Sequence, residues 1–163
     1  MIFSFVGAFV SILAITAFDQ WAWQPLGYPS TVASFGASAV LLFGVPDSKL
    51  AQPRNFLGGQ LISAVVGVAL RNAIPLPWLA MPVCCATALL LMQLTRSVHP
   101  PGGATALIAG GLNPLPRWRG WCFVVAVTVD CALMLGVALV SNNISVRRHY
   151  PTYWWSGVNK AAV

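Results

Sequence analysis

Long apolar runs dominate the chain, and short polar or proline-containing segments separate them. Six stretches of at least 16 residues contain no Asp, Glu, Lys or Arg, namely residues 1–18, 20–46, 55–70, 72–95, 97–116 and 131–146. A helix needs about 20 mainly apolar residues to cross a bilayer. The pattern therefore predicts an all-α integral membrane protein, a single transmembrane domain over residues 1–163, with elements at about 2–17, 26–45, 55–72, 78–96, 97–112 and 118–141.

The fifth element begins in an unusual way. His99-Pro100-Pro101 is followed directly by Gly102-Gly103-Ala104-Thr105. An ionisable ring, two residues without a backbone N–H and two glycines thus stand where a plain apolar helix is expected. Irregular backbone inside hydrocarbon is tolerated only where it faces protein or a water-filled cavity. We therefore expect a binding site or a passage at this segment.

An internal similarity relates the two halves of the chain. Three matches occur in the same order, which are Gly36–Leu41 with Gly103–Ile108, Pro53-Arg54 with Pro116-Arg117, and Gly67–Leu70 with Gly136–Leu139. Transporters often carry such weak repeats, and interrupted segments at corresponding positions mark their binding sites. The sequence predicts one repeat over about 2–72, a second over about 78–141, and a tail over 142–163.

The basic residues indicate how many times the chain crosses. If all six elements cross, six basic residues lie on the same side of the membrane as the termini, namely Lys49, Arg54, Arg96, Arg147, Arg148 and Lys160. The other three, Arg71, Arg117 and Arg119, lie on the opposite side. If elements two and five instead dip in and return, the basic residues divide without bias. The positive-inside rule favours six crossings with cytoplasmic termini, which makes the repeats of three elements inverted. Re-entry remains the alternative, because elements two and five are short.

With six crossings, the middle element of each repeat is predicted to be a short broken helix. Each enters as extended chain and becomes helical near Gly36 or Gly103, with Pro100-Pro101 preventing helix before that point. Inversion brings the two helix starts together near the bilayer midplane, from opposite faces. Helix N-termini carry free N–H groups and partial positive charge. Two of them can bind an anion without any buried lysine or arginine.

The candidate substrate-binding residues come from these two segments. They are Ser34, Phe35, Gly36, Ala37 and Ser38 in the first, and His99, Pro100, Pro101, Gly102, Gly103, Ala104 and Thr105 in the second. The three hydroxyls would donate to an anion, unless they bond back to their own helices. His99 would bind substrate, carry a proton, or fix the break through its own hydrogen bonds. Phe35 would narrow the passage or simply face lipid.

Few charged side chains accompany these segments. Arg54 and Arg96 would steer or pair with anions, or else anchor the protein at the membrane surface. Asp130, in the sixth element, is costly in a membrane unless it is paired, for example with one of these arginines, or relays protons. The four cysteines lack metal-ligand spacing, so we expect neither a metal nor a cofactor. The basic residues are scattered, which argues against nucleic acid as a partner.

Together these residues resemble the HPP family of small integral membrane proteins, named for the motif His99-Pro100-Pro101. The resemblance covers nearly the whole chain and includes Ala33–Leu41, Gln52–Asn55, Gly58-Gly59, Met92–Arg96, His99–Thr105, Asn142-Asn143 and Tyr150–Trp154. Family members in chloroplasts and cyanobacteria are associated with nitrite transport, whereas many bacterial members are uncharacterised. The resemblance implies a permease for nitrite or another small anion, in a bacterial inner membrane or an equivalent one.

Three classes of function follow from these observations. The first is a channel or transporter for a small monovalent anion, nitrite above all, with the lipid bilayer and a possible second copy of the chain as its partners. The second is a structural or assembly subunit of the membrane. The third is an intramembrane serine hydrolase, which would require His99 within hydrogen-bond reach of Ser38. Ser38 corresponds to Thr105 in the repeat, which suggests symmetry and not catalysis, so we expect no enzyme.

Overall fold

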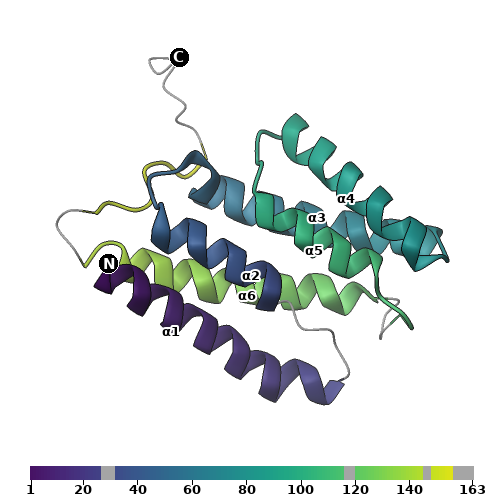
Figure 1. Cartoon of the computed structure of the whole chain (residues 1–163), viewed down its shortest axis with the longest axis horizontal. Helices are drawn as coiled ribbons and strands as arrows, with labels where there is room; N and C mark the ends of the chain where they lie inside the picture. Colours follow the sequence, from purple (N-terminus) through teal and green to yellow (C-terminus); the bar gives the residue numbers. More distant parts are fainter. Residues whose placement is uncertain (27–31, 116–119, 145–147, 156–163) are drawn as a thin grey trace.

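The computed structural model is a bundle of helices and describes residues 1–26, 32–115, 120–144 and 148–155 (Figure 1). The α-helices of this part are α1 (Ile2–Phe18), α2 (Val32–Ala39), α3 (Pro53–Ala73), α4 (Pro77–Leu94), α5 (Pro100–Gly110) and α6 (Trp121–Ser141). π-Helical turns continue α1 over Asp19–Trp23 and α2 over Val40–Gly44, and 3-10 turns occupy Gln24–Leu26 and Lys49–Ala51. The predicted all-α class is confirmed.

The helices fall into two length classes. Four segments of the described chain are long and apolar enough to cross a membrane, namely Ile2–Trp23, Pro53–Ala73, Pro77–Leu94 and Trp121–Ser141. The middle helices are shorter, since α5 has 11 residues and α2 has 8 before its π-helical turn of 5. At 1.5 Å per residue, α5 is about 16 Å long and α2 with its turn about 20 Å. Neither spans a hydrocarbon core of about 30 Å by itself.

Successive helices run in alternating directions (Figure 1). The bundle therefore has two ends, and we call the one that holds the N-terminus the terminal end. Three hydrogen bonds connect segments at this end. Arg148 Nη2 donates to Ser4 Oγ (2.7 Å), Tyr150 Oη to the Ala51 carbonyl (2.8 Å), and Arg54 Nη2 to the Thr95 carbonyl (2.8 Å). Burial raises the pKa of the Tyr150 phenol, which therefore keeps its proton and remains a donor.

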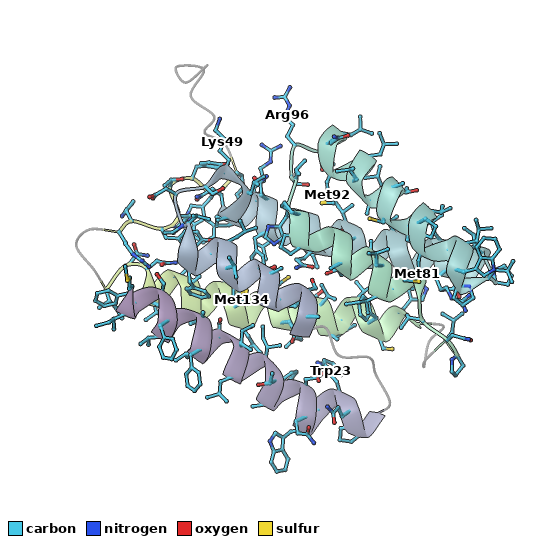
Figure 2. All side chains as sticks on the ribbon, in the orientation of Figure 1. Trp23, Lys49, Met81, Met92, Arg96 and Met134 are labelled. Atoms are coloured by element: carbon cyan, nitrogen blue, oxygen red, sulfur yellow. The ribbon has the colours of Figure 1, made fainter. Side chains whose placement is uncertain are left out.

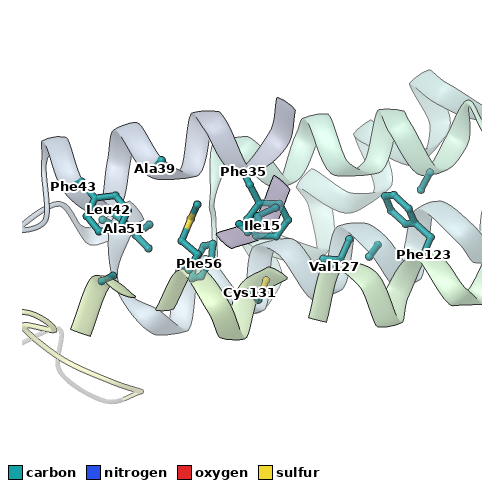
Figure 3. Close-up of a cluster of buried hydrophobic side chains, with 14 of the residues drawn as sticks. Ile15, Phe35, Ala39, Leu42, Phe43, Ala51, Phe56, Phe123, Val127 and Cys131 are labelled. Atoms are coloured by element: carbon teal, nitrogen blue, oxygen red, sulfur yellow. The ribbon is translucent and has the colours of Figure 1, made fainter. Parts of the chain in front are cut away.

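The apolar core lies where α1, α2, α3 and α6 meet (Figure 3). Ile15, Phe35, Phe56 and Phe123 are fully buried there, one from each of these helices. The Phe35 and Phe56 rings meet edge to face, with their centroids 6.2 Å apart, an arrangement that aromatic pairs favour. The core therefore fixes α2 against α3, and α3 in turn packs against α4 and α5.

The predicted starting points of the two short helices are wrong. α5 begins at Pro100, and both prolines lie in its first turn after an extended His99 with φ −136° and ψ 104°. Proline is compatible with this position, because the N–H it lacks would have no partner inside the helix. α2 begins at Val32 in the described chain, so Gly36 lies inside the helix. The extended chain expected before α2 falls on residues 27–31, which lie outside the described residues.

The opposite end of the bundle is held together by Arg71. Its guanidinium donates to the carbonyls of Leu112 (2.8 Å), Ile74 (3.0 Å) and Pro75 (3.2 Å), and the residue is buried. These bonds join the end of α3 to the start of α4 and the end of α5. The other basic residues predicted for this end, Arg117 and Arg119, lie outside the described residues, as do Arg147 and Lys160 of the terminal end and the Pro116-Arg117 match.

Replacing Arg71 with methionine will lower the free energy of unfolding by about 2 kcal/mol, because three carbonyls lose a charged donor. The matched control is Arg96→Met, which removes an exposed guanidinium and will change stability by less than about 0.5 kcal/mol. Thermal unfolding of both variants in one detergent measures the difference. Equal midpoint temperatures of unfolding for the two variants would show that Arg71 does not hold this end together.

Candidate functional site

Five fully buried polar side chains come together where α2, α3 and α5 meet. They are Ser34 and Ser38 of α2, Gln60 of α3, His99 at the start of α5, and Thr105 within α5. We call these five residues the polar cluster. Ser34 and Ser38 stand four residues apart and therefore share one face of α2. Sequence reasoning selected all of them except Gln60, and the structure brings the selected four together.

Gln60 occupies the centre of the polar cluster. Its Nε2 donates to Ser34 Oγ (3.1 Å) and to Ser38 Oγ (3.0 Å). Its Oε1 accepts a hydrogen bond from the Thr105 hydroxyl. One carboxamide therefore connects the hydroxyls of α2 with the hydroxyl of α5. A buried amide is costly unless its hydrogen-bonding groups are satisfied, and here three hydroxyls satisfy it.

Direct contacts also join α2 to α5. Ser34 Oγ donates to the Pro101 carbonyl at 3.2 Å and is in hydrogen-bond contact with the Thr105 hydroxyl. Ser38 meets His99, the residue that precedes α5. These contacts join the first two turns of both helices, which run in opposite directions (Figure 1). Their N-terminal turns therefore lie side by side. The tip-to-tip meeting expected from the sequence is therefore corrected to a lateral overlap.

His99 links the polar cluster to the terminal end. Its Nδ1 lies 2.8 Å from the Leu50 carbonyl oxygen, and its Nε2 lies 2.9 Å from Ser38 Oγ. The Phe56 ring meets the imidazole edge to face, with centroids 5.3 Å apart. Both ring nitrogens therefore have partners, and an aromatic ring of the apolar core holds the imidazole in place.

Glycine makes the crossing of α3 and α5 possible. A Cβ added to Gly102 would lie 2.8 Å from the Gly59 carbonyl oxygen and 2.8 Å from Ser63 Oγ. The backbones therefore approach too closely for any side chain at this point. Ser63 Oγ is buried and has no hydrogen-bond partner among the described residues. A free hydroxyl thus lies against the first turn of α5, next to the polar cluster.

The other residues predicted for the site surround the cluster or lie apart from it. Phe35 belongs to the apolar core. Gly36, Gly103 and Ala104 are half-buried, whereas Ala37 and Pro100 are exposed on the outer faces of their helices. A Cβ on Gly36 would meet nothing within 4 Å, and one on Gly103 only Cys85 Sγ at 3.7 Å. A close approach of backbones is found at Gly102 instead.

The two arginine candidates lie at the terminal end of the described chain, away from the polar cluster. Arg96 is exposed at the terminal end, and Figure 2 shows its side chain pointing away from the helices. Arg54 donates to the carbonyls of Thr95 (2.8 Å) and Trp155 (3.2 Å) at the same end. Asp130 is fully buried near the middle of α6. Anion steering by the arginines, and their pairing with Asp130, stay predictions.

Sequence reasoning missed Gln60 and Ser63, which α3 contributes. A signal for Gln60 was present, because an amide directly after Gly58-Gly59 in an uncharged run requires a partner inside the membrane. Ser63 follows it by one helical turn and therefore faces the same neighbour. In the described part of the chain, no group of three or more His, Cys, Asp or Glu residues is placed to hold a metal ion.

The family model of the HPP transmembrane region matches residues 1–151. The chain belongs to the HPP family. Two curated relatives are transmembrane proteins of Dictyostelium discoideum. The first is 49% identical to this chain, and the match covers 76% of this chain and 45% of the relative. The second is 40% identical, and the match covers 93% of this chain and 50% of the relative. This HPP chain thus spans about half the length of the relatives it matches. No solved structure matches it.

Proposed function

We propose that this HPP-family membrane protein is a channel or transporter for a small monovalent anion, with nitrite as its principal substrate. The polar cluster binds the anion. The observation that carries the proposal is the burial of five polar side chains at the overlapping N-terminal turns of two short helices. Hydroxyl, amide and helix-terminal N–H groups are donors that suit an anion. Beside them, Ser63 adds a buried hydroxyl that has no hydrogen-bond partner within the described part of the chain.

The proposed architecture is a pair of inverted repeats, residues 2–72 and 78–141, that share this site. Alternating helix directions support it, because three crossings place the second repeat upside down relative to the first (Figure 1). The shortness of α2 and α5 supports it too, since transporters of this type bind substrate at discontinuous middle helices. Lys49, Arg54, Arg96 and Arg148 lie at the terminal end, which favours cytoplasmic termini.

The size of the cluster favours a small substrate. Its side chains hydrogen-bond one another directly at 3.0–3.1 Å around the Gln60 amide, so a guest must replace those bonds with its own. A planar anion of three atoms can accept from several hydroxyls at once, whereas a large organic anion would have to separate the helices. Nitrite satisfies this condition and is the substrate that the family resemblance implies.

Flux measured in proteoliposomes tests the proposal. Purified protein will carry nitrite faster than empty vesicles do, and faster than it carries larger anions. The variant Thr105→Val removes a cluster hydroxyl and will reduce the flux by about tenfold, the effect of roughly 1.4 kcal/mol. The control Thr128→Val removes a hydroxyl that bonds only its own helix on the exposed face of α6 and will leave it unchanged. Flux equal to that of empty vesicles for every anion would overturn the proposal.

A serine hydrolase is the second candidate, because Ser38 Oγ lies 2.9 Å from His99 Nε2. This is the distance that a nucleophile and its general base require. Ser38 is also fully buried and accepts a hydrogen bond from Gln60, an arrangement suited to a binding network. A serine-directed fluorophosphonate will therefore leave Ser38 unmodified in the folded protein. Covalent labelling at Ser38 that is lost in the His99→Gln variant would favour the hydrolase instead.

A further inference from the structure

The hydrogen bonds of His99 determine which of its ring nitrogens carries the proton. The Leu50 carbonyl oxygen, 2.8 Å from Nδ1, can only accept, so Nδ1 bears hydrogen. In the neutral ring Nε2 then has a lone pair, which accepts from the Ser38 hydroxyl at 2.9 Å. A basic nitrogen thus faces the polar cluster, while the other nitrogen is fixed to the backbone of the terminal end.

The polar cluster contains no fixed positive charge. Its other members are two serines, a threonine and a glutamine, and all are fully buried together with His99. An anion that enters without compensation would therefore be a buried, unpaired charge, which is strongly unfavourable. A proton on His99 Nε2 makes the loaded site neutral. The Ser38 hydroxyl then no longer has an acceptor on the ring. Its other acceptor is the Ser34 carbonyl of its own helix at 3.3 Å, and an anion can replace that bond.

Among the described residues, the elements around the polar cluster place no lysine, arginine or second histidine at it. α2 and α5 contain no ionisable residue, and Lys49 and Arg96 are exposed at the terminal end. On α3, Arg54 and Arg71 are bound to carbonyls near its two ends, and Tyr150 donates to the Ala51 carbonyl. α4 contributes only Cys84 and Cys85, and Asp130 of α6 would add negative charge. His99 is therefore the group in the cluster that can change its charge.

We propose that His99 takes up one proton with each anion, so that the protein is an electroneutral anion–proton symporter and not an anion channel. The proton comes from water on one side, binds Nε2, and leaves with the anion on the other side, and no other bond is made or broken. This inference rests on the proposed function and specifies its energetics. One anion and one proton together carry no net charge. Their transport therefore requires no work against the membrane potential, which acts only on net charge.

The decisive experiment measures nitrite and protons together in proteoliposomes. Nitrite uptake will acidify the lumen by about one proton per anion, detected with a trapped pH dye, after subtraction of empty vesicles that report passive entry of the acid. A tenfold potassium gradient with valinomycin will not alter nitrite accumulation, whereas an anion uniporter would respond about tenfold. Uptake that follows the potential without acidification would overturn the symport and leave the anion transporter standing. No uptake would overturn both.

Two further measurements identify the carrier of the proton. His99→Gln removes the basic nitrogen, and its remaining nitrite flux will bring no protons, whereas the control His149→Gln, at an exposed position in the tail, will retain one proton per anion. Solid-state ¹⁵N NMR of the unmodified protein will show Nε2 of His99 gaining a proton when nitrite is added, without relying on a variant. Unchanged stoichiometry in His99→Gln, or an Nε2 that stays unprotonated with nitrite, would exclude His99 as the carrier.

Discussion

Replacing Gln60 with leucine will reduce nitrite flux by at least about a hundredfold. The change keeps an apolar side chain of similar size but removes the amide that donates to Ser34 and Ser38 and accepts from Thr105. Two hydroxyls lose a donor and one loses its acceptor, and each buried group left without a partner costs about 1–3 kcal/mol. The replacement thus removes a contact from three of the other four members of the cluster at once.

The matched control is Gln93→Leu, an exposed glutamine on α4. It makes the same chemical change away from the cluster and will transport nitrite like the unmodified protein. The variants are compared by initial rates in vesicles with equal amounts of monodisperse protein. If Gln60→Leu folds, elutes normally and transports at the unmodified rate, the cluster is only a structural feature of the helix interface and the anion passes elsewhere.

Replacing Gly102 with alanine will destabilise the protein by about 3 kcal/mol and abolish flux, because overpacking a tight crossing separates the helices. The added carbon would lie 2.8 Å from the Gly59 carbonyl oxygen and 3.1 Å from its carbon. These are backbone atoms, which cannot rotate away. α5 must then move from α3, and Thr105 moves away from Gln60 with it.

The adjacent glycine provides the control. A Cβ at Gly103 would meet only Cys85 Sγ at 3.7 Å, an ordinary contact. Gly103→Ala will therefore leave the fold intact and raise the free energy of unfolding by up to about 1 kcal/mol, since alanine is the better helix former. Thermal unfolding of the two variants in the same detergent measures the contrast. Similar losses of stability in both would contradict the close crossing of α3 and α5 at Gly102.

Charge-free runs were sufficient to predict the helices of this fold, because spanning segments must satisfy their backbone internally. The same pattern could not fix where the short helices begin. Proline was interpreted as preventing a helix before Gly103, yet it is equally compatible with the first turn, where Pro100 and Pro101 lie. The deciding interaction is tertiary, since α5 must place Gly102 against Gly59, and a sequence pattern holds no information about that contact.

The site residues on the two similar segments, at α2 and at the start of α5, could be predicted from the sequence. Those on α3, which lies between these segments in the sequence, could not. Ser34, Ser38, His99 and Thr105 were selected because they border interruptions. Gln60 was not, since it lies inside an uninterrupted helix. Its importance follows from its position opposite both repeated segments, which becomes visible only when α3 is packed against α5 and its side chains meet those of α2. Arg54 and Arg96 lie at the surface of the terminal end, so anion steering by them stays a prediction.

If an anion binds among the hydroxyls of the polar cluster, a crystal structure with a bound anion will locate it there. Crystals of the protein with bromide as an anomalous marker will show a peak within hydrogen-bond distance of the Ser34, Ser38 and Thr105 hydroxyls. Added nitrite will displace that peak. Bromide or nitrite bound only at the arginines of the terminal end, with the hydrogen bonds of Gln60 unbroken, would contradict the account.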